Sequence, residues 1–184
     1  ELSGCLFDKQ EDLRIQGGAL SGVLPLVLER NYNSRVTEAG RGGVLGIGWR
    51  LNIEAHLTLH VTGRAPGGTT GGASFWALHD GEMRVIRLPF LEALGEWVSV
   101  PAEEIEWCRA DEDAWDLLDH QGLTWRYHMW REAECRLVAI MDRAGNTITV
   151  NYHQDEARPS GLTDPFGRHL RLEYEGERLT GVWL

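Results

Sequence analysis

The last third of the chain repeats itself. Residues 141–152 and 163–174 carry the same pattern, and each matched position is shifted by 22. The matched positions, first copy and then second, are Asp142, Gly145, Ile148, Val150 and Tyr152, and Asp164, Gly167, Leu170, Leu172 and Tyr174. A fixed period of this length is typical of repeat architectures, in which a unit buries its apolar face by stacking on its neighbours. This feature restricts the possible folds more than any other in the sequence.

Each unit has the pattern of a β-hairpin. The Asp-x-x-Gly motif predicts a turn, because an Asp side chain can bond nearby backbone N–H groups and Gly tolerates a positive φ angle. After the turn, apolar and polar residues alternate from Thr147 to Tyr152, which predicts a strand with one buried face. A second short strand is expected before the turn, at Leu137 and Ile140, and a similar pair recurs 42 positions later.

A degenerate third copy extends the repeat towards the N-terminus. Its turn runs from Asp119 to Gly122, and Gly122 lies 23 positions before Gly145. The repeated sequence pattern therefore covers residues 115–184. We expect an all-β fold of consecutive antiparallel hairpins that form a curved, open sheet, whose edge strands could pair with another chain.

Two segments near the N-terminus also predict strands. Residues 24–35 place alternate side chains on one face, and Pro25 should lie at a strand start or edge because it has no amide donor. Residues 51–61 alternate most regularly and predict one continuous strand. The positions singled out here are Leu24, Leu26, Arg30 and Tyr32 in the first strand, and Gly46, Gly48 and Trp49 in the glycine-rich approach to the second.

The middle of the chain predicts shorter elements. Residues 75–88 resemble a hairpin around Asp80-Gly81, residues 97–100 form a strand candidate, and residues 89–96 favour a helical turn. Residues 101–113 are strongly acidic and are expected to form a solvated rim. We accordingly divide the chain into an opening segment (1–62), a variable hairpin region with Gly-rich and acidic loops (63–114), and the hairpin repeats (115–184).

Three motifs together resemble a known family. The first is Gly-Arg-x-Leu-x-Leu-x-Tyr-x-x-x-x-Leu-Thr-x-Val at residues 167–182. The others are Leu-Pro-Leu-x-Leu-x-Arg-x-Tyr-x-Ser at residues 24–34 and Gly-x-Leu-Gly-x-Gly-Trp at residues 43–49. The first resembles the YD repeat of the Rhs (rearrangement hotspot) family, and the other two resemble the start of an Rhs shell. The resemblance implies a piece of a large β-sheet shell that wraps a toxin domain.

Composition excludes several classes of function. The formal net charge of −10 disfavours binding to phosphate backbones, so we expect no nucleic-acid partner. No apolar run reaches the length of about 20 residues that a membrane helix needs. The three cysteines are scattered, which argues against a disulfide framework or a zinc site. The eight tryptophans suggest strand packing, with a sugar-stacking surface as the alternative.

No stretch carries an enzyme signature. The Gly- and Thr-rich segment 67–72 lacks the Gly-Lys-Ser/Thr of a phosphate-binding loop. His56 and His60 are four apart on a predicted strand, roughly 13 Å, which is too far for one metal ion. Asp164-Pro165-Phe166-Gly167 is similar to the self-cleavage site of Rhs shells, but it keeps the register of an ordinary repeat turn. We therefore predict no catalytic, metal or cofactor site.

The leading hypothesis is a structural one. The resemblance implies a wall segment of a shell that encloses a C-terminal toxin. We expect a bacterial secretion system of type VI to deliver this toxin. Its partners would be the remainder of the shell, the toxin, and secretion spike proteins or a chaperone, and it would reside in the cytoplasm before export. The alternative is a Trp-rich module that binds glycans or cell surfaces, which requires exposed, coplanar tryptophans. Because the chain begins at Glu1 and stops within a repeat, we expect it to be a fragment of a longer polypeptide.

Overall fold

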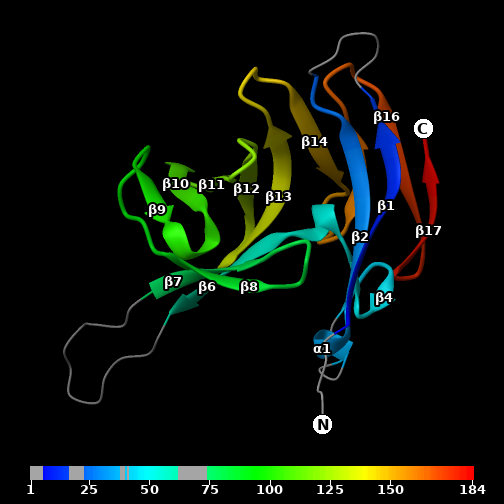
Figure 1. The fold of residues 1–184 in the computed structure, drawn as a ribbon, viewed down its shortest axis with the longest axis horizontal. Helices are drawn as coiled ribbons and strands as arrows, with labels where there is room; N and C mark the ends of the chain where they lie inside the picture. Colours follow the sequence, from blue (N-terminus) through cyan, green and yellow to red (C-terminus); the bar gives the residue numbers. More distant parts are fainter. Residues whose placement is uncertain (1–5, 17–22, 38–39, 41, 62–73) are drawn as a thin grey trace.

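The computed structural model in Figure 1 describes residues 6–16, 23–37, 40, 42–61 and 74–184. Cys5 and the Gly- and Thr-rich segment 62–73 lie outside the described residues. Within them, almost all regular structure is β-strand, so the predicted all-β fold is confirmed. None of the described helices is long and apolar enough to cross a membrane.

One large sheet contains the repeats. Its strands from β9 to β17 lie side by side in sequence order, and each pairs antiparallel with the next. Their bounds are β9 (Trp97–Val100), β10 (Ile105–Asp111), β11 (Ala114–Leu118), β12 (Thr124–Arg131), β13 (Glu134–Met141), β14 (Thr147–Tyr152), β15 (Pro159–Thr163), β16 (His169–Glu175) and β17 (Arg178–Trp183). The sheet is visibly curved in Figure 1. The prediction of consecutive hairpins is therefore confirmed.

The large sheet forks at β13. Residues 139–141 of β13 pair with β14, whereas residues 134–136 pair with β6. Three further strands extend this branch in the order β6 (His56–Val61), β7 (Ser74–His79) and β8 (Val85–Pro89). The opening segment is thus joined to the repeats through backbone hydrogen bonds.

The rest of the opening segment forms a smaller sheet that packs on the repeats. It consists of β1 (Phe7–Ile15), β2 (Leu26–Asn33) and β5 (Trp49–Leu51), with β2 in the centre. The short elements beside these strands are α1 (Ser34–Thr37), β3 (Gly42–Gly43), β4 (Gly46–Ile47) and the 3₁₀ turn Asn52–Glu54, and a second 3₁₀ turn, Pro101–Glu103, precedes β10. Figure 1 shows β1 and β2 running across β14 to β16, and Arg168 Nη2 donates to the Gln16 carbonyl at 2.9 Å.

A single apolar cluster joins the two sheets. Leu26 and Leu28 of β2 belong to the same cluster as Leu162 and Leu170 of the repeats, and all four are buried. Burying one such side chain contributes about 1.5–3 kcal/mol, so the docking of β2 is a large part of the stability of this region. The alternation predicted for the repeats is confirmed as well. Ile148, Val150, Leu170 and Leu172 are buried, while Thr149, His169 and Arg171 on the opposite face are exposed.

Several predicted elements differ from the structure. Residues 51–61 are not one strand, because the 3₁₀ turn Asn52–Glu54 separates β5 from β6. The strand predicted for residues 24–35 is shorter, because β2 runs from Leu26 to Asn33 and α1 begins at Ser34. Residues 89–96 contain no helix: the chain bends there, and Gly95 has a φ angle of 76°. The acidic stretch is not simply a loop, because β10 runs through it and buries Trp107 and Cys108.

Candidate functional site

The three repeat turns have nearly identical geometry. In each, the Gly N–H donates to the carbonyl of the Asp three positions earlier, at 3.0 to 3.1 Å. The φ angles of Gly122, Gly145 and Gly167 are 83°, 84° and 79°. Each Asp Oδ1 accepts the backbone N–H groups two and four positions later, at 2.9 to 3.0 Å. The carboxylate therefore fixes the turn by saturating its backbone donors.

The second carboxylate oxygen has a different partner in each copy. Asp142 Oδ2 accepts from Asn146 Nδ2 at 2.7 Å, and Asp164 Oδ2 accepts from Arg168 Nε at 2.6 Å. Burial alone would raise the pKa of Asp142 and of Asp164, but these hydrogen bonds outweigh it and lower both pKa values. In the third copy Asp119 Oδ2 accepts from Trp125 Nε1 at 2.8 Å.

A fourth turn of the same kind closes the β7–β8 hairpin. Met83 N–H donates to the Asp80 carbonyl at 3.0 Å, and Arg84 N–H donates to Asp80 Oδ1 at 2.7 Å. Met83 occupies the glycine position with a φ angle of 62°. The hairpin predicted around Asp80-Gly81 is confirmed, and its positive φ angle lies at Met83. Gly81 lies against the backbone of Asn52, where an added Cβ would come within 2.7 Å of the Asn52 Cα.

The repeat tyrosines connect neighbouring strands. The Tyr152 hydroxyl donates to the Leu137 carbonyl at 2.7 Å, and the Tyr174 hydroxyl donates to the Pro159 carbonyl at 2.6 Å. Both carbonyls lie 15 positions before the tyrosine. Leu137 stands within β13, between the residues that pair with β6 and those that pair with β14, and Pro159 is the first residue of β15. We call these two contacts the tyrosine latches. Each gives a carbonyl of one strand a side-chain donor from the next strand of the sheet.

An arginine side chain lies over the ring of each of these tyrosines. The sequence analysis did not single out these arginines. The Arg136 guanidinium carbon lies 4.1 Å from the centre of the Tyr152 ring, and that of Arg158 lies 4.7 Å from the Tyr174 ring. Arg136 and Arg158 are themselves separated by 22 positions, so the repeat period could have revealed them. Cation–π contacts at such partly exposed sites contribute about 0.5–1 kcal/mol each.

Several residues of the two opening motifs are buried or contact one another. Leu24 and Leu26 are buried, and Pro25 immediately precedes β2, as expected. The Arg30 side chain bonds Gln10 and Asp12 of β1 and lies over the Trp49 ring, 5.4 Å from its centre. Packing of Trp49 is confirmed, because its ring centre lies 5.0 Å from that of Tyr32.

Gly46 and Gly48, in the motif at residues 43–49, are required for different reasons. Gly46 has a φ angle of 106° in the β3–β4 hairpin. Gly48 has a φ angle of 80°, and an added Cβ would also come within 2.7 Å of the Tyr32 ring. At Gly48, therefore, both the backbone conformation and the neighbouring side chains leave no place for a larger residue.

Glu54 connects the parts of the opening segment. Its Oε1 accepts Val44 N–H at 2.9 Å and its Oε2 accepts Leu51 N–H at 2.8 Å. Burial raises the pKa of this carboxyl, and the two backbone donors oppose that effect. The sequence pattern placed Glu54 on the polar face of a continuous strand, so it gave no sign of this contact. The Val44 carbonyl in turn accepts Leu179 N–H at 2.9 Å, which ties the segment to β17.

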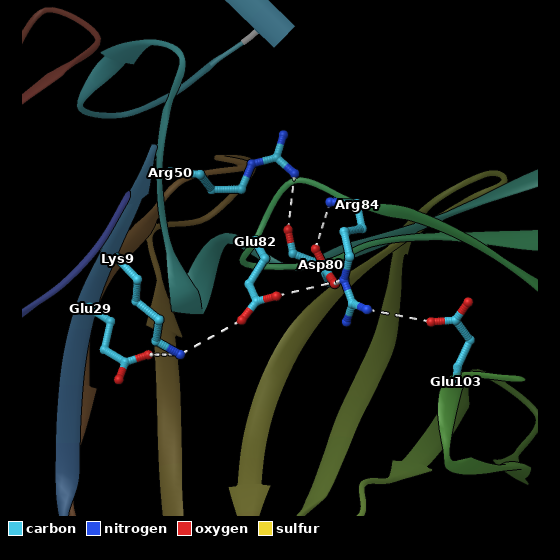
Figure 2. A network of polar contacts seen from close by, with 7 residues as sticks. All are labelled: Lys9, Glu29, Arg50, Asp80, Glu82, Arg84 and Glu103. Carbon is cyan, nitrogen blue, oxygen red and sulfur yellow. Dashed lines mark hydrogen bonds and ion pairs between the residues drawn. The ribbon is translucent and has the colours of Figure 1, made fainter. Parts of the chain in front are cut away.

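A network of charged side chains links the two sheets, as Figure 2 shows. Lys9 of β1 pairs with Glu29 at 2.9 Å and with Glu82 at 3.7 Å. Arg84 pairs with Asp80 at 2.7 Å and reaches Glu103 at 3.5 Å. Burial raises the pKa of Asp80, although the adjacent Arg84 acts in the opposite direction. The network brings together β1, β2, the β7–β8 turn and the 3₁₀ turn before β10.

The remaining polar candidates lie apart from one another. His56 stacks on His79 with ring centres 4.5 Å apart, and His60 stacks on Phe75. Among the described residues, no group of three or more His, Cys, Asp or Glu side chains is arranged to hold a metal ion. Asp164 and Pro165 belong to an ordinary repeat turn. The buried Cys135 thiol has a pKa raised by burial to about 12, which disfavours the reactive thiolate.

Comparison with known proteins identifies one domain. Residues 2–70 match a family described as a domain of unknown function (DUF6531). The match covers the opening segment and ends before the hairpin repeats. A comparison with curated proteins gives no match.

Proposed function

We propose that this chain is a structural wall segment of an Rhs-type, YD-repeat shell that encloses a toxin domain. The observation that supports this most directly is the way the repeats add to one sheet. Units spaced by 22 or 23 residues contribute successive strands, with the same turn geometry in three copies and the same tyrosine latch in two of them. A sheet built in this manner can be extended by further units, because each new unit can use the same turn and the same contacts with its neighbour.

The edge at β17 fits such an extension. Among the described residues, β16 is the one strand that pairs with β17. Leu179 N–H donates to the Val44 carbonyl, while Val182 and Trp183 near the end of β17 are exposed. An exposed, partly apolar edge strand is a template for pairing with another strand. We propose that the remainder of the same shell covers this edge. The enclosed toxin, secretion spike proteins and a chaperone are further proposed partners.

The proposed role needs no chemistry from this chain. The repeat residues shape the turns and pack the sheet, and the toxic activity belongs to another part of the polypeptide. The bacterial cytoplasm, followed by delivery into a competing cell through a type VI secretion system, is the proposed location. The purified chain should show no hydrolase turnover.

The glycan-binding alternative has less support. It needs several exposed tryptophans in one plane, but Trp76 and Trp107 are buried in the core. Trp125 donates to Asp119, and Trp130 is covered by the Arg131 guanidinium, 3.9 Å from its ring centre. Trp97 and Trp183 are exposed, at 44% and 57%. They lie on β9 and β17, at opposite ends of the strand order, and Trp183 Nε1 donates to Glu173, so the two rings do not form one stacking platform.

Negative-stain electron microscopy of the full-length gene product that contains this chain tests the proposal. We expect hollow particles with density inside. Compact or filamentous particles without a cavity would refute encapsulation, although the hairpin repeats would be unaffected. Glycan-array binding by the 184-residue chain would then become the next measurement.

A further inference from the structure

A cavity lies between β2 and the curved large sheet. Its volume is about 540 Å³, and its walls come from β2, from the β7–β8 hairpin, and from β10 to β14. The charged network of Figure 2 includes residues that line it, among them Glu29, Asp80 and Arg84. The wall also contains two aromatic side chains, Trp125 and Tyr127. A cavity of this size that combines an apolar wall with polar groups able to orient a ligand is typical of small-molecule sites.

The apolar wall of the cavity is incompletely covered. Leu24 and Ile105 line it and keep 8% and 9% of their surface exposed. Leu57 and Leu137, elsewhere in the same apolar cluster, are fully buried. A ligand in the cavity could remove the remaining apolar surface of Leu24 and Ile105 from water.

Asn31 provides a polar group without a partner in this wall. Asn31 is 1% exposed, and its Oδ1 has no hydrogen-bond partner among the residues that the structure describes. Lys9 and Arg50 lie opposite Asn31 on the two adjacent strands, but their charges are directed elsewhere. Lys9 pairs with two glutamates, and Arg50 Nη1 donates to the Asp80 carbonyl at 3.4 Å. A buried acceptor without a partner destabilises the fold unless a donor reaches it.

The charges around the cavity disfavour an ionic ligand. The lining residues carry five carboxylates (Glu29, Asp80, Glu82, Glu103 and Asp119) and three cationic side chains (Lys9, Arg14 and Arg84). Each of these cations is already paired with a carboxylate. A charged ligand would have to displace such a partner, because moving a charge into an apolar cavity is costly without one. Asn31 Oδ1 needs a donor, which a neutral N–H or O–H group can supply.

We propose that this cavity binds a neutral aromatic small molecule with a single N–H or O–H donor, of the indole or phenol class. The ring contacts the apolar wall that includes Ile105 and Leu117, and the donor bonds Asn31 Oδ1. This proposal does not depend on the shell function proposed above.

Isothermal titration of the 184-residue chain with indole and with benzothiophene tests the proposal. The two rings have nearly the same shape, but benzothiophene has no donor and is the more apolar. Hydrophobic partition alone therefore favours benzothiophene. We expect indole to bind at least tenfold more tightly, a difference of about 1.4 kcal/mol. Tryptamine and indole-3-acetate, which add a charge of either sign, should both bind more weakly than indole.

Two kinds of variant locate the binding. Asn31→Leu should remove the preference for indole and raise the Tm of the ligand-free chain, because it eliminates the unpaired acceptor. Asn151→Leu is the matched control, since Asn151 bonds Thr163 outside the cavity and should leave the preference unchanged. Ile105→Trp should fill the cavity and abolish binding of both rings. Leu117→Phe serves the same purpose if Ile105→Trp does not fold.

Three results would overturn the proposal. The first is no heat of binding for indole up to millimolar concentration. The second is equal or tighter binding of benzothiophene by the unmodified chain. The third is an indole preference that persists in Asn31→Leu. Binding of N-acetyltryptophanamide but not of free indole would also refute it, because the occupant would then be a side chain of a partner protein.

Discussion

The same substitution in two repeat turns, Asp164→Asn and Asp142→Asn, should lower the free energy of unfolding by different amounts. In both turns Oδ1 accepts two backbone N–H groups, which an asparagine oxygen can also do. The difference lies at Oδ2. In Asp164→Asn the new side chain would direct its amide NH₂ at Arg168, which can only donate. Asn146, the partner of Asp142, can rotate its amide and accept instead.

The structure gives the size of the difference. Asp164 is 4% exposed, and its partner Arg168 is partly exposed. A hydrogen bond to a charged group contributes about 1.5–3 kcal/mol, and water can replace part of it on the Arg168 side. We therefore expect Asp164→Asn to lower the free energy of unfolding by about 2 kcal/mol, and Asp142→Asn to lower it by about 0.5 kcal/mol or less.

Urea denaturation followed by circular dichroism measures both losses, and unchanged m-values would show that the comparison is valid. A third variant isolates the cause. Adding Arg168→Gln to Asp164→Asn should recover part of the loss, because glutamine can accept from the new amide. Equal losses at the two aspartates, or no recovery with Arg168→Gln, would refute the argument.

Three further changes test other contacts. Tyr152→Phe and Tyr174→Phe should each lower the free energy of unfolding by about 1 kcal/mol in urea denaturation, because each leaves a strand carbonyl without its donor. Ala133→Gly should raise it by about 0.5–1 kcal/mol, because Ala133 holds a φ angle of 64° that is strained for an L-residue. Glu54→Gln should alter the pH dependence. Burial raises the pKa of Glu54 above its usual 4.5, so the folded chain holds this proton more tightly than the unfolded chain. The stability of the unmodified chain relative to Glu54→Gln should therefore fall as the pH rises from about 4.5 through the raised pKa.

Each of these has its own control. The two tyrosine variants should have similar effects, and a loss in only one of them would contradict a shared latch. Ala144→Gly lies in a turn without a positive φ angle at that residue, so it should destabilise where Ala133→Gly stabilises. Parallel pH curves for the unmodified chain and Glu54→Gln would contradict the raised pKa.

The sequence alone determined the hairpin units. An Asp-x-x-Gly turn followed by period-two alternation is a local signal, since the turn hydrogen bonds and the side-chain faces involve residues only a few positions apart. For that reason the turns at Asp119, Asp142 and Asp164 and the buried faces of β14 and β16 were predicted correctly. The turn at Asp80 was only partly predicted, because Met83 adopts a conformation that sequence patterns assign to glycine.

The tertiary structure decided how these units are joined. Glu54 breaks a regular alternation because its carboxylate finds backbone donors at Val44 and Leu51, and the chain turns there from one sheet into the other. The fork at β13 and the isolation of Asn31 likewise depend on contacts between residues far apart in sequence. Period-two patterns record which face of a strand is buried, but they do not record what lies against it. The cavity beside Asn31 therefore exists only in the folded chain.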